Sequence, residues 1–312
     1  CGPLGSRYQA TRLHQEVERF RQNMGWLGRI LDRSAHWLLK WRIIRGPARW
    51  MANSRYAWSI VSRTDRVRMR RMQTRVLSDK LPEHISIIMD GNRRYASNSG
   101  LAATLGHRAG KEKLEEVMDW VLEIGVPYLT VYALSTENIS SRKPDELKAL
   151  FNLYVEGLND LAIDERIHKN HVKVRVVGRM DLLPQNVLEA IENTEKVTAD
   201  YDKFVFTVCL AYGSREEIIE AVREIAKEHA KGTLELDAID EKEISNRLWT
   251  GDMPDPDLVI RTSGEERISN FLLWQSAYAE YYFTDVYWPS FSKTDLLEAI
   301  EAYQNRKRRF GE

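Results

Sequence analysis

Cysteine is almost absent from this 312-residue chain, which has only Cys1 and Cys209. A disulfide framework is therefore excluded, and Cys209, within the apolar run FVFTVCLAYG, is typical of a small buried hydrophobe. No apolar run is long enough to span a bilayer, and no signal peptide is visible. We therefore expect a cytoplasmic protein in a reducing compartment.

Several functional motifs are also missing. The chain has no Walker or GxGxxG loop, no cysteine or histidine spacing typical of zinc, and no GxSxG elbow. These absences argue against a P-loop nucleotidase, a dinucleotide enzyme, a zinc site and a serine hydrolase of the elbow type.

The charge is unevenly distributed, although 46 basic and 46 acidic residues give a formal net charge of zero. Residues 7–80 hold 18 Lys plus Arg against 5 Asp plus Glu, or +13, and the remainder carries 28 − 41 = −13. This split predicts a basic arm at 7–80 and a separate acidic domain at 81–312. Residues 1–6, which contain GPLGS, resemble the remnant of a protease site from an expression vector.

The arm combines an apolar stripe with tryptophan and arginine. Between Leu13 and Leu31 the apolar residues follow helical spacing, and tryptophans stand at 37, 41, 50 and 58 among many arginines. This composition is typical of a helix lying on anionic lipid. Packing on the main domain or on a second copy explains the stripe equally well. Basic aromatic stretches also bind phosphate backbones, but we expect no nucleic-acid partner.

From residue 84 onward, short β-rich runs alternate with longer segments of helical periodicity. The predicted strands are HISIIMD, YLTVYAL, VKVRVVG, FVFTVCLAY and DLVIRT. Near-continuous apolar strands separated by helices predict an α/β fold with a mostly parallel sheet covered by helices, preceded by the α-helical basic N-terminal arm. Ligands of such sheets bind at the carboxyl ends of the strands.

The segment MDGNRRYA, residues 89–96, places polar side chains at such a strand end. Asp90 is suited to Mg²⁺, which prefers oxygen ligands. Gly91 lets the backbone approach a ligand, and the amides that follow can cradle an anion. Asn92 and Arg94 add donors for phosphate oxygens. A solvated turn capped by the aspartate is the alternative explanation.

Two more clusters follow along the chain. YALSTEN puts Ser135, Glu137 and Asn138 after the second strand, with Arg142 shortly beyond, although a capping box starting at Ser135 is the simpler local explanation. GHRAG puts His107 beside an arginine at the start of a helix, which favours an anion site over a purely structural histidine.

A fourth cluster follows the strand DLVIRT. Arg261, Arg267 and Ser269 are suited to grip a second polyanion, and Glu280 lies in an aromatic stretch where a carboxylate needs a partner or a metal. Core packing explains most of FLLWQSAYAEYYF. Two carboxylates, several arginines and an apolar surround suit diphosphates attached to hydrocarbon chains.

These segments, together with NRKRRFG near the C-terminus, closely resemble the cis-prenyltransferases, the undecaprenyl diphosphate synthase-like family, over roughly residues 81–311. The resemblance implies an α/β fold with a deep hydrophobic tunnel, a homodimer and Mg²⁺ as cofactor. The implied reaction is cis-prenyl chain elongation, in which isopentenyl diphosphate condenses with an allylic prenyl diphosphate to give a polyprenyl diphosphate. Glycosyl carrier lipid would be its use, and the enzyme would lie peripherally on the inner face of the membrane.

The resemblance also implies a role for each matching residue. Asp90 would hold Mg²⁺ and assist departure of the allylic diphosphate, and Glu280 would make a second metal contact. The other catalytic positions are Asn92, Ser135 and Asn138. The substrate-binding positions are Gly91, Arg93, Arg94, Tyr95, His107, Glu137, Arg142, Arg261, Arg267, Ser269, Arg309 and Gly311. The last two form a C-terminal RxG pattern that in this family reaches across the dimer.

Some positions depart from the family pattern. Ala103 stands where the family usually has an arginine, which bears on the diphosphate grip and on substrate choice. Tyr95 and Ile139 replace frequent tryptophans, and Phe204 and Leu210 add bulk on the strand that shapes the tunnel. This bulk predicts a medium-length or short product, which Leu210→Ala is expected to lengthen.

Three alternatives to chain elongation are considered. The first is prenyl transfer to a non-standard acceptor with non-head-to-tail condensation, which the alanine at 103 suggests. The second is a non-catalytic lipid-binding subunit of a prenyltransferase complex, against which the nearly complete site argues. The third, an aspartyl phosphotransferase, would need a second aspartate where Asn92 stands.

Overall fold

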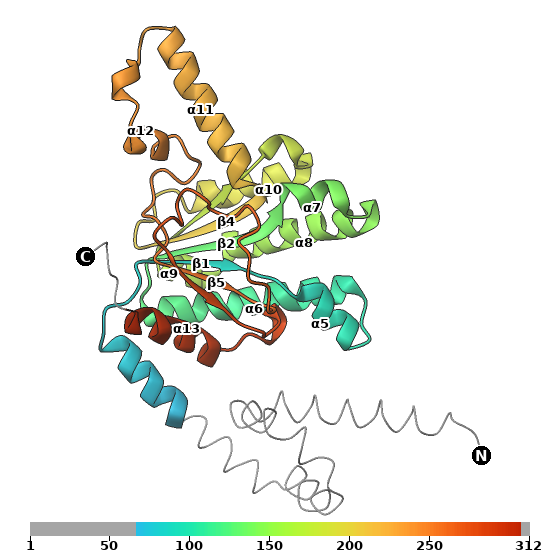
Figure 1. Cartoon of the computed structure of the whole chain (residues 1–312). Coiled ribbons are helices and arrows are strands. Elements are labelled where there is room, and N and C mark those ends of the chain that lie inside the picture. Colours follow the sequence, from blue (N-terminus) through green and yellow to red (C-terminus); the bar gives the residue numbers. More distant parts are fainter. Residues whose placement is uncertain (1–66, 307–312) are drawn as a thin grey trace, which may run out of the picture. The chain divides into compact units, whose positions relative to one another are not determined.

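A computed structural model of the chain describes residues 67–306 (Figure 1). The chain divides into two units, Cys1–Ser78 and Asp79–Glu312. In the first unit, residues 67–77 form a helix. The rest of the predicted arm, its tryptophans included, lies outside the described residues, as do Arg309 and Gly311. None of the described helices is long and apolar enough to cross a membrane.

The second unit is built on a six-stranded sheet in the order β3-β4-β2-β1-β5-β6. The strands are β1 (His84–Ile88), β2 (Tyr128–Ser135), β3 (Val172–Val177), β4 (Phe204–Tyr212), β5 (Leu258–Arg261) and β6 (Glu280–Phe283). Every neighbouring pair is parallel, which confirms the predicted α/β class. The first five strands are the predicted ones, and β6 is an addition from the aromatic stretch.

Helices connect and cover the strands. They are α5 (Asn92–Asn98), α6 (Ala103–Ile124), α7 (Thr136–Ser141), α8 (Pro144–Ile163), α9 (Glu165–Lys169), α10 (Gln185–Val197), α11 (Ser214–Ala230), α12 (Glu241–Ser245) and α13 (Lys293–Asn305). Short 3₁₀ turns occur at Met180–Leu182 (η1), Leu236–Ala238 (η2) and Trp288–Ser290 (η3). The chain thus alternates strand and helix as its apolar periodicity predicts.

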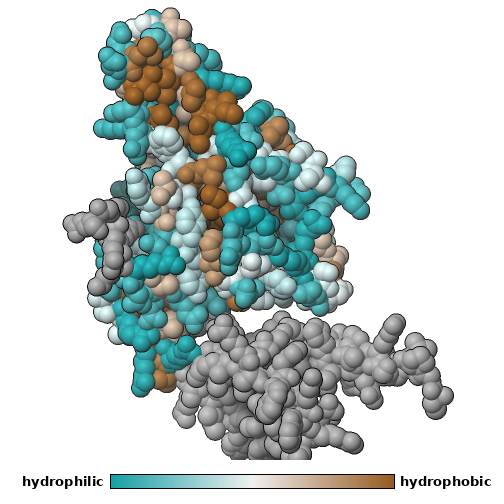
Figure 2. Space-filling model, viewed as in Figure 1, coloured by the Kyte–Doolittle hydropathy of each residue, from teal (hydrophilic) through white to brown (hydrophobic). Residues whose placement is uncertain are grey.

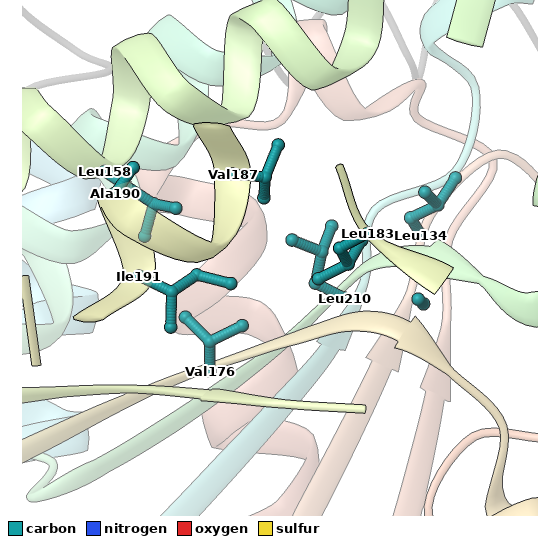
Figure 3. Packing of buried hydrophobic residues seen from close by; sticks show 9 residues of the cluster. Leu134, Leu158, Val176, Leu183, Val187, Ala190, Ile191 and Leu210 are labelled. Atoms are coloured by element: carbon teal, nitrogen blue, oxygen red, sulfur yellow. The ribbon is translucent and has the colours of Figure 1, made fainter. Parts of the chain in front are cut away.

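One face of the sheet packs against α8 and α10. Figure 3 shows Leu158 of α8 and Val187 and Ile191 of α10 gathered over Leu134 and Leu210 of the sheet. All five side chains are buried, and removing such apolar area from water stabilises the unit by about 25 cal/mol per Å². This packing holds α8 close to β2 and β4, which is the position that shapes the site.

The other face of the sheet is covered by the segment that follows β5. Phe271 and Leu272 of that segment pack against Tyr132 of β2 and Tyr212 of β4. The rings of Tyr132 and Phe271 stack with centroids 4.7 Å apart. Aromatic pairs of this kind contribute about 0.5–1.5 kcal/mol beyond their buried area. The segment carrying the predicted Arg267 and Ser269 is thereby fixed to the sheet.

Candidate active site

The strand register brings the predicted site residues to one edge of the sheet. Ile88 at the end of β1 lies beside Tyr132 of β2 on one side and beside Arg261 of β5 on the other. Asp90 follows β1, and Ser135 is the last residue of β2. Because neighbouring strands are parallel, both residues lie at the same carboxyl edge as Arg261. The prediction of a shared polar edge therefore agrees with the register.

Asp90 lies at the centre of this edge. Its Oδ1 is 3.0 Å from Nη2 of Arg94 and its Oδ2 is 2.9 Å from Nη2 of Arg261. Its backbone is fixed by Thr262, whose hydroxyl accepts from the Asp90 amide at 2.9 Å and donates to its carbonyl at 2.7 Å. Burial raises the pKa of Asp90, but hydrogen bonds and charge from Arg261 and Arg94 outweigh it and hold the pKa below 3.8.

A second set of contacts organises the loop after β5. Nη1 of Arg94 lies 2.8 Å from Glu265, and Glu265 also pairs with Arg267. Nη1 of Arg261 donates to the hydroxyl of Ser269 at 2.8 Å and to the carbonyl of Arg267. The predicted residues Arg261, Arg267 and Ser269 are therefore in direct contact, next to Asp90.

A third cluster lies where α6 begins. Nε2 of His107 lies 3.5 Å from Glu146 and 3.4 Å from Nη1 of Arg142, and Arg142 itself pairs with Glu146. The Nε of Arg93 lies 3.8 Å from the same carboxylate. Burial lowers the pKa of His107 below 6.5, and the charge of Arg142 lowers it further against the opposing effect of Glu146. The lowered pKa favours the neutral imidazole of His107.

The residues of YALSTEN are positioned by a bulge and by a helix cap. The pairing of β2 with β4 shifts register between Tyr132 and Ser135, and the carbonyl of Ala133 within this bulge accepts a hydrogen bond from Tyr154 at 2.9 Å. Ser135 then caps α7 by accepting from the Asn138 amide at 3.1 Å. Ser135 is therefore the N-cap of α7, which is one half of the capping box expected from the sequence, and it also lines the site.

Glu137 is tied to the loop after β5. Its Oε1 accepts a hydrogen bond from Nδ2 of Asn270 at 3.1 Å, and Asn270 also contacts Glu216 at 3.2 Å. Asn270 has a φ of 63°, a conformation in which asparagine is enriched. This contact links the predicted second and fourth clusters.

Close backbone packing explains the two glycines of GHRAG. A Cβ at Gly106 would lie 2.2 Å from the carbonyl oxygen of Asn92, and one at Gly110 would lie 2.5 Å from its Oδ1. The glycines therefore let α5 lie directly on α6. The Oδ1 of Asn92 is buried and accepts no hydrogen bond from the described residues. Trp288 closes the same contact by donating to the Gly110 carbonyl at 2.8 Å.

These groups surround the open end of a cavity of about 1440 Å³. The apolar residues of its walls come from α6, α8, β3 and β4, and include Leu114, Met118, Leu150, Leu153, Leu161, Val176, Phe206, Val208 and Leu210. Cavities that bind small ligands typically measure 300–1,000 Å³, so this one has room for a long chain. The cavity agrees with the predicted hydrophobic tunnel.

Two predicted residues lie away from the cavity edge. Glu280 begins β6 and pairs with Arg306. It lies beside Leu258, which pairs with Ile85, so roughly 16 Å of strand separates its position from that of Asp90. The described chain therefore does not bring Glu280 to Asp90. Tyr95 is also not among the residues that line the cavity.

Sequence analysis missed Glu146 and Glu265, the carboxylates that neutralise the site arginines. Glu265 stands between Arg261 and Arg267 in a polar loop, and Glu146 is in the first turn of α8, where an acidic residue is common at any helix start. The helical spacing of Arg142 and Glu146, four residues apart, was the available signal.

The donor set at this edge fits a magnesium ion shared with substrate. Among the described residues, no group of three or more His, Cys, Asp or Glu side chains is arranged to hold a metal. Mg²⁺ at phosphate sites commonly uses one or two carboxylates plus phosphate oxygens and water. Asp90, at the polar end of the cavity among arginines, supplies the one carboxylate that this arrangement requires.

Known proteins resemble this chain in both sequence and fold. The family model described as "Putative undecaprenyl diphosphate synthase" matches residues 88–311. A tritrans,polycis-undecaprenyl-diphosphate synthase (geranylgeranyl-diphosphate specific) of Methanopyrus kandleri is 54% identical over 240 residues, covering 77% of this chain and 88% of the relative. The protein of the same description from Thermoplasma volcanium is 50% identical over 230 residues, covering 74% of this chain and 89% of the relative.

A solved structure agrees with these relatives. The crystal structure of lavandulyl diphosphate synthase from Lavandula x intermedia, in complex with dimethylallyl diphosphate, aligns with a TM-score of 0.72 at 35% identity. The alignment covers 74% of this chain and 99% of that chain. The fold and site thus define an α/β enzyme with an arginine-rich polar edge at the open end of an apolar cavity. The chain belongs to the undecaprenyl diphosphate synthase family and is a prenyltransferase.

Proposed function

We propose that this enzyme elongates geranylgeranyl diphosphate, or an allylic diphosphate of similar size, with isopentenyl diphosphate to give a cis-polyprenyl diphosphate. The observation that carries the proposal is the position of Asp90 between Arg94 and Arg261 at the open end of a long apolar cavity, which the separate cluster of His107 and Arg142 also lines. The names of the relatives, which are described as specific for geranylgeranyl diphosphate, support the choice of primer.

The two clusters suit two diphosphate groups. His107 and Arg142 on one side, with Arg93 near their shared partner Glu146, would bind the allylic diphosphate, whose chain extends into the cavity. Arg261, Arg267 and Ser269 on the other side would bind isopentenyl diphosphate. In the structure these arginines are paired with Asp90, Glu146 and Glu265. Each diphosphate would therefore exchange one anionic partner for another, which keeps the arginines ordered before substrate arrives.

The chemistry needs charge stabilisation and exclusion of water. When bound, Mg²⁺ supplies stabilisation of the negative charge that develops on the departing diphosphate. Asp90 would hold that ion, and Arg94 would donate to the departing oxygens. Ser135 and Asn138, at the start of α7, would line the position of the reacting carbons. The apolar walls would shield the electron-poor allylic carbons from water.

The same proposal includes a homodimer and a membrane contact. Ile219, Val222 and Leu236 are 50%, 51% and 63% exposed, and Figure 2 shows apolar surface gathered over α11 and the segment after it. Exposed apolar area of this kind supports pairing with a second copy. Val222→Asp should therefore lower the molar mass measured by light scattering.

Residues 7–80 would contact the membrane that receives the lipid, consistent with use of the product as a glycosyl carrier lipid.

One observation favours a second candidate, non-head-to-tail condensation between allylic substrates. Ala103 lines the cavity where the family usually has an arginine, and a lavandulyl diphosphate synthase is among the similar structures. Different side-chain contacts to the allylic diphosphate would accompany a different choice of the carbons that are joined. The branching of the product distinguishes the two candidates.

The deciding experiment incubates the purified protein with labelled isopentenyl diphosphate, Mg²⁺ and allylic diphosphates of several lengths. Products are dephosphorylated, sized and examined for branching, with Asp90→Ala and an EDTA-treated sample as controls. We expect linear cis-prenols, most abundant from the C20 primer and lost in both controls. Branched products would support the second candidate, and no product from any primer would contradict both.

A further inference from the structure

One flank of the apolar cavity is lined by charged side chains. Between α6 and α8 the lining includes Lys111 and Glu115 from α6 and Asp160 from α8. Along α6, Lys111 and Glu115 lie between His107, at the polar end of the cavity, and Met118, near its inner end. Lys111 is one helical turn beyond His107. A prenyl chain that grew inward from the polar edge would therefore pass this flank.

Lys111 joins the two helices across the flank. Its Nζ lies 2.6 Å from Asp160 and 3.7 Å from Glu156, both on α8, and 3.1 Å from Glu115 on its own helix. The side chain is only 17% exposed. A Cβ at Gly157 would lie 3.4 Å from Cε of Lys111, so the aliphatic stem packs directly against the backbone of α8.

The ammonium group stays charged in this position. Burial lowers the pKa of Lys111, but hydrogen bonds to Asp160 and Glu115 outweigh that effect and raise the pKa above 10.5. A hydrocarbon chain that passed sideways between α6 and α8 would separate these charges and place them against apolar groups. Unpaired charge in such surroundings is strongly unfavourable.

We propose that Lys111, held by Asp160, is a specificity-determining residue that closes the flank of the tunnel and keeps the growing prenyl chain inside it. With the flank closed, the chain can extend only toward the inner end, so the length of the enclosed cavity limits the product. With the flank open, the chain can emerge sideways and continue to grow. The inference rests on the proposed elongation activity.

The test compares product lengths of Lys111→Ala with those of Lys113→Ala. Lys113 is a matched control because it is also on α6, is 14% exposed and pairs with Glu116 at 2.5 Å. Its Nζ lies 5.3 Å from the centroid of the Trp120 ring, so both Glu116 and Trp120, its partners, belong to α6. Lys113 does not line the cavity. We expect Lys111→Ala to increase severalfold the fraction of prenols longer than the main wild-type product, and Lys113→Ala to leave the distribution unchanged.

Two further variants keep the test decisive if Lys111→Ala folds poorly. Lys111→Met retains the length of the side chain without its charge and should also lengthen the products, whereas Lys111→Arg should retain the wild-type distribution. Unchanged products in both Lys111→Ala and Lys111→Met would overturn the inference, as would equal lengthening in Lys113→Ala. Absence of any elongation by the wild-type enzyme would instead contradict the proposed function.

Discussion

Asp90 and Arg261 form an ion pair, with Oδ2 and Nη2 2.9 Å apart, although 171 residues separate them in the chain. Adjacent strands bring them together, because Arg261 ends β5 beside Ile88 of β1. The Arg261 side chain is only 4% exposed, so its guanidinium is paired with Asp90 instead of being solvated by water. The pair therefore connects the two proposed diphosphate positions before either is occupied.

We expect Asp90→Asn to lower kcat by about 10²–10³-fold, because it removes the carboxylate proposed to hold Mg²⁺ while preserving the side-chain shape. The free energy of unfolding should change by only about 1 kcal/mol, since the Asp90 side chain is 28% exposed. Steady-state assays at several Mg²⁺ concentrations and a urea titration measure the two quantities. Asp181→Asn, which breaks an exposed pair with Arg179, is the matched control.

A kcat within threefold of wild type at saturating Mg²⁺ would contradict this role for Asp90. Acidification should also lower the free energy of unfolding, because it removes the same charge on Asp90 that the variant removes. Because the folded pKa of Asp90 lies below 3.8, its contribution to stability is complete above that pH and is lost as the pH falls through the folded value.

A second prediction concerns His84 at the opposite end of β1. Its Nδ1 lies 2.7 Å from the Pro254 carbonyl and its Nε2 lies 2.8 Å from the Thr130 hydroxyl, an arrangement that fits the neutral ring. Burial lowers the pKa of His84 from 6.5 to about 4, against smaller opposing effects of Pro254 and Asp257. The unfolded chain therefore binds more protons between these two values, and stability rises with pH across that window.

Urea titrations at pH 7 and pH 5 measure this effect. We expect His84 to account for about 2 kcal/mol of the stability lost between the two pH values. His84→Gln should be less stable at pH 7 but should lose about 2 kcal/mol less on acidification. An identical loss in wild type and variant would show that other groups govern the acid sensitivity.

The fold could largely be predicted because five of its strands carry strong local signals. Apolar β-rich runs such as HISII and FVFTVCLAY bury most of their side chains, and polar residues follow each one at the edge where ligands bind. The four-residue β6 carries no such signal, because its aromatic residues fit core packing as well as an edge strand. The position of Glu280 depends on that strand, so it could not be predicted from spacing.

The site could be predicted only in part, because the sequence pattern identifies candidate ligand-binding side chains more readily than the side chains that they contact. Asp90 and Arg94 follow β1 and Arg261 ends β5, so the sequence alone assigns all three to one edge of the sheet. Glu146 was not predicted, since its contacts with His107 and Arg93 depend on how α8 packs beside α6. The register shift before Ser135 likewise requires knowledge of its partner strand.

A third prediction follows from the packing of α5 on α6. Gly106→Ala would place a Cβ 2.2 Å from a backbone oxygen of Asn92, which cannot move without displacing α5. We expect a loss of about 1–3 kcal/mol in the free energy of unfolding and reduced activity, because Asn92 and Asp90 would shift together. Gly157→Ala on α8 is the control, since its Cβ would make only an ordinary contact with Lys111 at 3.4 Å.

Gly157→Ala should be neutral or stabilising by up to about 1 kcal/mol, because alanine restricts the unfolded chain. Thermal and urea unfolding of both variants measure the difference. Equal stability of the two variants would show that α5 moves away from α6 at little cost.

The fourth prediction concerns the inner end of the tunnel. Leu210 and Phe204 were the residues expected from the sequence to limit the product. In the structure, Leu210 lies beside Leu134, next to Ser135, and is therefore near the polar edge. Phe204 does not line the main cavity but a second one of about 20 Å³. Phe206 and Met118 line both cavities, so together they form the wall between them.

We therefore expect Phe206→Ala to join the two cavities and to lengthen the main product, because the prenyl chain gains room at its inner end. Leu210→Ala should instead widen the cavity near its mouth and change product length less than Phe206→Ala, which revises the expectation from the sequence. Both variants remove buried apolar volume, so each should be less stable by about 2–5 kcal/mol, and their comparison separates chain length from stability. Sizing of the dephosphorylated products measures the outcome. Longer products from Leu210→Ala than from Phe206→Ala would place the limiting wall at the mouth of the tunnel.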